Sequence, residues 1–96
     1  MERQETKPTV YVKTGCPWCI QALRFFRDKK IDLHVVDVLR DRKSMERLIA
    51  ISSQTRTPTF EYRDFVVADF SIDEFLQALE RHPSVKEEMG FGTSSS

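Results

Sequence analysis

The two cysteines of the chain, Cys16 and Cys19, are separated by Pro17 and Trp18. Thiols at this spacing can form a redox couple, supply half of a metal site, or lie unreacted in a core. At the start of a helix they would share one face, with Cα atoms within the ~4.4–6.8 Å that a disulfide spans. A helix N-terminus also offers unpaired N–H groups and partial positive charge. Both favour the thiolate of Cys16 and thus redox chemistry.

The residue types around the pair indicate different roles. We expect Cys16 to be the attacking thiolate and Cys19, one turn into the helix, to resolve the mixed disulfide. Lys13, just before the pair, is a candidate cation that supports the thiolate. Pro17 stiffens the intervening loop and removes one N–H donor. Trp18 offers an aromatic surface to a peptide or to glutathione.

Two other interpretations of the cysteine pair are less consistent with the sequence. A structural zinc site normally needs four ligands, and the two histidines, His34 and His82, show no second ligand pair. We therefore expect no metal. A pair of inert buried thiols would leave the proline between them without a packing reason. The sequence favours the redox couple.

The elements that must position the cysteines follow from hydrophobic periodicity. Residues 9–12, "TVYV", predict a buried strand. Pro17 suits the first turn of a helix, and apolar residues continue at helical spacing to position 26. Residues 31–38, "IDLHVVDV", predict a second strand with apolar residues on both faces, as in a strand covered on both sides. Strand, helix and strand with short joints predict a right-handed unit with parallel strands.

The second half of the chain predicts a helix, a hairpin and a helix. The helix begins near Asp41 or Ser44, and the hairpin spans residues 60–67. Residues 71–82 open with the capping-box pattern and end before Pro83. The order βαβαββα predicts an α/β three-layer sandwich, with helices flanking a small mixed four-stranded sheet. The buried stripe expected on the last helix is Ile72, Phe75, Leu76 and Leu79.

Composition limits the classes of partner. The chain has 96 residues, with 15 basic and 15 acidic side chains; this balance argues against a nucleic-acid partner. It lacks an apolar run of ~18 residues, so we expect no membrane span. The polar N-terminus predicts a cytoplasmic protein, where thiols stay mostly reduced. We expect one monomeric domain over residues 8–83, after a polar lead of residues 1–7 and before a disordered tail of residues 84–96.

Two segments resemble the glutaredoxin family of the thioredoxin superfamily. "VYVKTGCPWC" resembles the strand and Cys-Pro-aromatic-Cys opening, and "TRTPTF" resembles the Thr-Val-Pro segment before the third strand. The likeness runs from about residue 7 to residue 82 and implies a thioredoxin-like fold. By this resemblance Cys16 is the nucleophile, Cys19 the resolving cysteine and Lys13 the supporting lysine. Pro58 matches the cis-proline facing the sulfur, and the backbone of Thr57 would pair with a substrate chain.

The sequence departs from the family at one place. Glutaredoxins have two glycines after the fourth strand, where this chain has Ala68 and Asp69. Asp69 would lie near the γ-glutamyl carboxylate of bound glutathione, and its charge argues against strong binding. The following stretch, "DFSIDEF", resembles glutaredoxin-like redoxins that serve ribonucleotide reductase and take electrons from thioredoxin reductase.

The sequence therefore predicts a glutaredoxin-like thiol–disulfide oxidoreductase of cell redox homeostasis and electron transport. It would reduce protein or glutathione mixed disulfides without a bound cofactor, using glutathione as a possible co-substrate. A first alternative is a redoxin that thioredoxin reductase reduces. A second is a dimeric module binding a [2Fe–2S] cluster through Cys16 and glutathione thiols, against which Pro17 argues. A third is a thioredoxin-fold domain kept for interaction only.

Overall fold

The computed structural model describes residues 7–89 and contains a mixed four-stranded sheet in the order β2-β1-β3-β4. Strand β1 (Thr9–Val12) pairs in parallel with β2 (His34–Asp37). On its other side β1 pairs antiparallel with β3 (Thr59–Tyr62), which in turn pairs antiparallel with β4 (Phe65–Val67). The parallel β1–β2 pair and the β3–β4 hairpin are both as predicted from the sequence.

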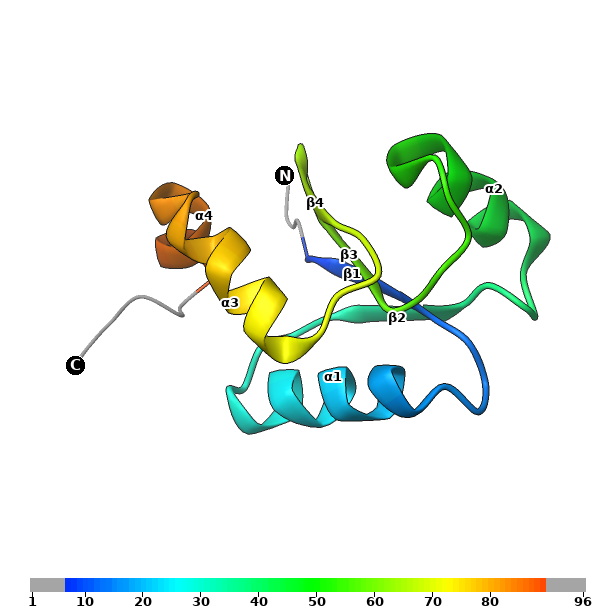
Figure 1. Ribbon diagram of the computed structural model, residues 1–96, viewed down its shortest axis with the longest axis horizontal. Coiled ribbons are helices and arrows are strands. Elements are labelled where there is room, and N and C mark those ends of the chain that lie inside the picture. Colours follow the sequence, from blue (N-terminus) through cyan, green and yellow to red (C-terminus); the bar gives the residue numbers. More distant parts are fainter. Residues whose placement is uncertain (1–6, 90–96) are drawn as a thin grey trace, which may run out of the picture.

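Helices cover both faces of this sheet (Figure 1). Helix α1 (Pro17–Asp28) connects β1 to β2 and shares a face of the sheet with α3 (Ile72–Glu80). Helix α2 (Arg42–Ser52) packs on the opposite face. Helix α4 (Pro83–Glu88) follows α3. The result is the expected three-layer sandwich. No helix within residues 7–89 is both long and apolar enough to cross a membrane.

A cluster of phenylalanines holds α1 in place. Phe26 of α1, Phe60 of β3 and Phe75 of α3 are fully buried. The ring centroids of Phe26 and Phe60 are 5.4 Å apart, and those of Phe60 and Phe75 are 4.8 Å apart. Cys19 and Ala22 are buried with Phe26 on the same side of α1. Burying this side sets the rotation of the helix, so Cys19 points into the core and Cys16 stays near the surface.

The hairpin forms without glycine. The turn between β3 and β4 consists of Arg63 and Asp64, and Arg63 adopts a φ of 55°. Two-residue hairpin turns need such positive φ values, which usually favour glycine or asparagine. The sheet on one side and the buried Tyr62 and Phe65 keep the strands in register despite this unusual turn residue.

Three expectations from the sequence need correction. The tail expected over residues 84–96 is not wholly disordered: Pro83 opens α4 as an N1 residue instead of only ending α3. The hydroxyl of Tyr62 donates to Glu88 at 2.9 Å and helps hold α4 against the core. Leu76, expected in the buried stripe, is 39% exposed. Residues 1–6 and 90–96 lie outside the described part of the chain.

The third correction concerns β2. The side carrying Val36 and Val38 packs against the α2 cluster, as expected for a covered face. The other side is only partly covered, and Val35 is 49% exposed. The sequence pattern does not distinguish these cases, because it cannot show that β2 is an edge strand with one neighbour.

Candidate active site

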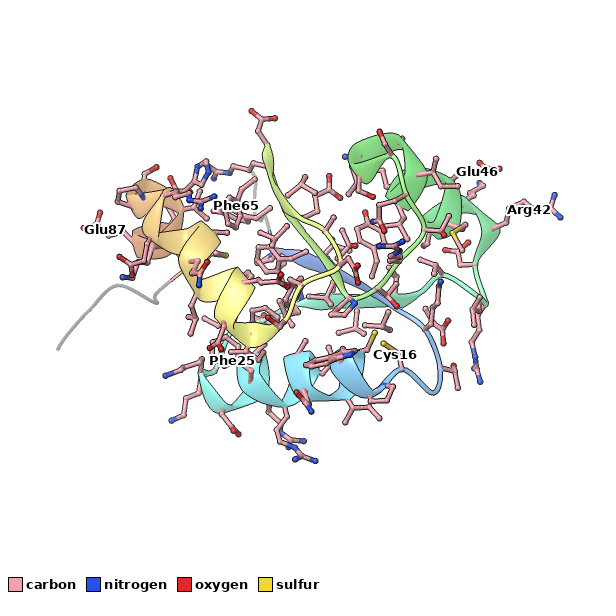
Figure 2. The ribbon with its side chains drawn as sticks, in the orientation of Figure 1. Cys16, Phe25, Arg42, Glu46, Phe65 and Glu87 are labelled. Carbon is pink, nitrogen blue, oxygen red and sulfur yellow. The ribbon has the colours of Figure 1, made fainter. Side chains whose placement is uncertain are left out.

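Cys16 is the N-cap residue of α1. Its backbone is extended, with φ −89° and ψ 110°, and Pro17 occupies the first turn. Cys16 is labelled in Figure 2. The N–H of Cys19 donates to the Sγ of Cys16 at 3.2 Å. A hydroxyl or carboxylate oxygen usually accepts this bond at a helix start. Here a sulfur takes that place, and the helix N-terminus favours its negatively charged form.

The turn before Cys16 requires a glycine. Gly15 has a φ of +83°, a conformation that strains residues with a side chain. The N–H of Cys16 donates to the carbonyl of Lys13 at 3.2 Å and closes this turn. The glycine thus allows a short turn to connect β1 directly to the helix that carries both cysteines.

The segment around Pro58 reaches the sulfur from the other half of the chain. The hydroxyl of Thr57 lies 3.7 Å from the Sγ of Cys16 and donates to it. The thiol of Cys16 lies 3.8 Å from the carbonyl oxygen of Thr57. The Thr57–Pro58 peptide bond is cis, the form that the family resemblance implied. The fold therefore brings together the two segments that the sequence singled out.

The two thiols differ in acidity. Burial raises the pKa of Cys16, but hydrogen bonds from the Cys19 and Thr57 side chains and from backbone N–H groups outweigh it. The net effect lowers the pKa of Cys16. Burial, together with the hydrogen bond to Cys16 and its charge, raises the pKa of Cys19 to about 11. Both cysteines are free thiols, Cys19 being the buried one. This arrangement is the one expected of an attacking thiolate at Cys16 and a protonated resolving thiol at Cys19.

Lys13 contributes its backbone to this site. The largest contributions that lower the pKa of Cys16 are hydrogen bonds from Cys19, Thr57 and Trp18. The side chain of Lys13 is half-buried next to the turn. Support of the thiolate by this lysine remains a prediction.

Asp37 is a site residue that the sequence analysis did not identify. Its carboxylate accepts hydrogen bonds from the hydroxyl of Thr14 and, at 2.9 Å, from the N–H of Leu39. The bond from Thr14 is the main cause that lowers the pKa of Asp37. Because β1 and β2 are parallel, their carboxyl ends meet, and Asp37 pairs in register with Val12. Asp37 thus ties the turn before Cys16 to the end of β2.

Asp69 lies beside the cis-proline segment. Its side chain forms an ion pair with Arg56 at 3.4 Å, and the next residue, Phe70, donates its N–H to the carbonyl of Pro58 at 3.2 Å. Asp69 has a φ of 51°, which aspartate tolerates better than most residues with a side chain. This explains how the chain keeps the turn without the glycine found there in glutaredoxins.

A small hollow connects Asp69 to the first turn of α1. It measures about 130 Å³ and is lined by Trp18, Asp69, Phe70, Ser71 and Glu74. The predicted capping box is present: the N–H of Glu74 donates to Ser71 Oγ at 3.2 Å, and the N–H of Ser71 donates to Glu74 Oε1 at 2.9 Å. The N–H groups of Ser71 and Glu74 thus already have an internal acceptor.

Comparison with known proteins identifies the family. A family model for glutaredoxin matches residues 9–67, which include both cysteines and the cis-proline. The chain belongs to the glutaredoxin family. A search of curated proteins found no match.

Solved structures show the same fold for this glutaredoxin. The thioredoxin-like protein BC3987 is 30% identical, with a TM-score of 0.68, over 76% of this chain and 100% of that one. A glutaredoxin from Archaeoglobus fulgidus is 18% identical, with a TM-score of 0.67, over 80% of this chain and 96% of that one. The buckwheat glutaredoxin–glutathione complex is 13% identical, with a TM-score of 0.65, over 88% and 76% of the two chains.

Proposed function

We propose that this chain is a thiol–disulfide oxidoreductase that reduces protein disulfides through Cys16 and Cys19. The observation that carries the proposal is the opposed acidity of the two thiols: the pKa of Cys16 is lowered, while that of the adjacent Cys19 is raised to about 11. This asymmetry favours the thiolate at Cys16, near the surface, and the protonated thiol at Cys19, in the core. No bound cofactor is needed for this chemistry.

The reaction has two exchange steps. The thiolate of Cys16 attacks a substrate disulfide, forms a mixed disulfide, and releases one substrate sulfur, which takes up a proton. The negative charge of Cys16 helps to raise the pKa of Cys19. Formation of the mixed disulfide removes that charge. Cys19 then loses its proton more easily and attacks the Cys16 sulfur. The second substrate thiol leaves, and the Cys16–Cys19 disulfide awaits two electrons and two protons from a thiol reductant.

The substrate chain would bind beside Thr57 and Trp18. Proline has no N–H, so the backbone of Thr57 is the polar group next to the sulfur that can pair with an extended peptide. Trp18 is 56% exposed in the first turn of α1 and offers apolar contact area. These features support a protein substrate.

A second proposal concerns which molecule reduces the Cys16–Cys19 disulfide. The hollow where the γ-glutamyl carboxylate of glutathione would lie carries two carboxylates, those of Asp69 and Glu74. The capping box already uses N–H groups at the start of α3. Like charges repel the tripeptide there, and the N–H groups of Ser71 and Glu74 are already taken as donors. This favours reduction by thioredoxin reductase, with a protein such as ribonucleotide reductase as a recipient of electrons.

Two assays test the oxidoreductase activity and the choice of reductant, and the first is re-reduction of the oxidised protein. Trp18 fluorescence is followed with glutathione and its reductase, and in parallel with NADPH and thioredoxin reductase. We expect fast reduction only by the second route, and a gain of the glutathione route in the double variant Ala68→Gly, Asp69→Gly. Fast reduction of the unaltered protein by glutathione would overturn the choice of reductant. Failure of dithiothreitol-reduced protein to reduce insulin would overturn the oxidoreductase itself.

A further inference from the structure

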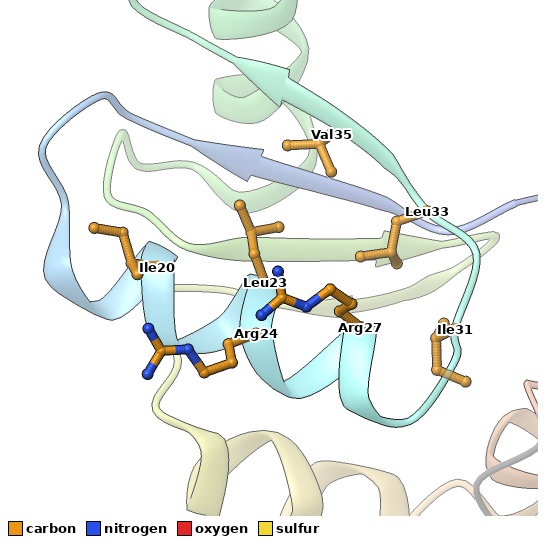
Figure 3. Close-up of a pocket in the computed structure, with 7 residues that line it drawn as sticks. All are labelled: Ile20, Leu23, Arg24, Arg27, Ile31, Leu33 and Val35. Carbon is orange, nitrogen blue, oxygen red and sulfur yellow. The ribbon is translucent and has the colours of Figure 1, made fainter.

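A groove of about 460 Å³ runs between α1 and the edge strand β2. We call it the α1–β2 groove (Figure 3). Helix α1 supplies one wall, and β2 with the segment before it supplies the other. Its lining residues are Ile20, Leu23, Arg24, Arg27, Ile31, Leu33 and Val35.

The floor of the groove is apolar and accessible. Ile31 and Leu33 precede β2 and Val35 lies in it, and the side chains of all three line the groove. Val35 is 49% exposed, and Ile20 on the opposite wall is 56% exposed. Branched apolar side chains gathered in a groove, instead of scattered singly, are typical of a binding surface.

The backbone of β2 is open along the same groove. The N–H of His34 donates to the carbonyl of Pro8, just before β1, at 2.8 Å, and the N–H of Val38, just after β2, donates to the carbonyl of Val12 at 3.0 Å. Peptide groups alternate in direction along a strand, so those of Val35 and Asp37 point away from β1. No described strand pairs with that side of β2. An extended peptide could add there as a further strand.

Two arginines give the groove its charge. Arg24 and Arg27 lie one turn apart on α1 and line the same wall. Neither guanidinium forms an ion pair with a residue among positions 7–89, whereas Arg47 and Arg63 are each paired with a glutamate. Two guanidinium groups with no ion-pair partner in the described part of the chain, beside an apolar lining, fit carboxylates of a partner.

We propose that the α1–β2 groove docks an extended segment of a protein substrate whose groove-facing side chains, at every second position, are apolar and acidic. Apolar side chains would enter between α1 and β2, backbone groups would pair with β2, and carboxylates would meet Arg24 and Arg27. The groove begins at Ile20, next to Cys19, so a docked segment would lie beside the helix turn that carries the redox pair. The inference rests on the proposed function only in naming the occupant a substrate.

Charge also separates this occupant from a second copy of the chain. Symmetric pairing of two β2 edges would place the arginine-bearing walls of both copies together, and like charges oppose that contact. A nucleic acid would use the arginines but leave the branched apolar floor and the strand edge without partners. The peptide satisfies all three features.

Binding can be measured without any thiol chemistry. The probe is a synthetic six-residue peptide, Val-Thr-Glu-Thr-Val-Thr, in which the valines and the glutamate share one face. It is titrated into the reduced full-length protein and followed by amide NMR shifts. We expect shifts at β2 and along Ile20 to Arg27, and weaker binding at high salt. The double variant Arg24→Glu, Arg27→Glu should lose about tenfold or more in affinity. Arg81→Glu, an exposed charge reversal outside the groove, should bind normally.

Several outcomes would overturn the proposal. These are absence of shifts at millimolar peptide, shifts confined to another face, and equal binding of a peptide with lysine in place of glutamate. Concentration-dependent shifts of β2 without peptide would assign the groove to a second copy. A change of the groove signals on deletion of residues 90–96 would assign it to the chain's own C-terminus.

The same peptide extended by a disulfide tests the link to catalysis. We expect the protein to reduce it faster than a small aromatic disulfide, and the double arginine variant to lose this advantage while reducing the small disulfide normally. If the small disulfide is not reduced, the proposed function fails, but the NMR result for the groove still stands. If only the advantage is missing, the groove is not used by substrates.

Discussion

The backbone N–H of Cys19 donates to the Sγ of Cys16 at 3.2 Å. The residue that carries the second thiol therefore stabilises the charged form of the first. The same helical turn buries the side chain of Cys19, which is 2% exposed. One turn of α1 thus separates the roles of two chemically identical groups, and the first two predictions follow from this asymmetry.

Replacing each cysteine by serine should give different products. Cys16→Ser should abolish disulfide reduction, because the attacking thiolate is lost. Cys19→Ser keeps the attack but removes resolution, so mixed disulfides with substrate should accumulate. Mass spectrometry of the protein under non-reducing conditions measures both. Substrate trapped on Cys19 in the Cys16→Ser variant would reverse the two roles.

The pH dependence of alkylation should separate the thiols. A thiol reacts as its thiolate, so the rate rises as pH passes the pKa. For Cys16 this rise should come at lower pH than for an ordinary thiol, because its pKa is lowered by hydrogen bonds to the sulfur. Cys19 should react only as pH approaches its pKa of about 11. Iodoacetamide labelling with peptide mapping at each pH measures both profiles.

Thr57 should contribute to the acidity of Cys16. Thr57→Val removes the hydroxyl that donates to Sγ at 3.7 Å while keeping the shape of the side chain. The alkylation profile of Cys16 should therefore shift to higher pH. Thr55→Val, at an exposed position of the same loop, is the matched control and should leave the profile unchanged. Identical profiles for both variants would remove Thr57 from the site.

Asp37 should act as a positioning residue. Asp37→Ala frees the hydroxyl of Thr14 and the N–H of Leu39, so the turn before Cys16 loses its attachment to β2. Reduction of a small disulfide should slow several-fold, with a change in the pH profile of Cys16. Asp64→Ala in the hairpin turn is an exposed control. A lower melting temperature, with an unchanged rate of disulfide reduction and an unchanged pH profile of Cys16, would show a structural role instead.

The phenylalanine cluster should dominate stability. Phe75 is fully buried against the other phenylalanines, so Phe75→Ala should lower the free energy of unfolding by ~3–5 kcal/mol. Leu76, its neighbour on α3, is 39% exposed. Leu76→Ala should cost well under half as much. Urea unfolding followed by circular dichroism measures the free energy of unfolding of both variants. Similar losses for Phe75→Ala and Leu76→Ala would contradict the burial of Phe75 and the exposure of Leu76.

Local signals in the sequence determined much of this protein. The strand of residues 9–12, the helix opening at Pro17 with Cys16 as its cap, and the capping box of Ser71 and Glu74 all depend on neighbours within one turn. Such patterns can be read from a sequence because the interactions that produce them are local. The cis form of the Thr57–Pro58 bond is different: most X–Pro bonds are trans, and only the family resemblance predicted it.

The tertiary structure decided the contacts between distant segments. Thr57 meets Cys16 across 41 positions of sequence, and Thr14 meets Asp37 across 23. Asp69 pairs with Arg56 only because the β4–α3 loop lies along the cis-proline segment. The exposure of Val35 depends on which strand lies at the edge of the sheet. Chain topology sets these relationships, and residue pattern alone carries little information about them.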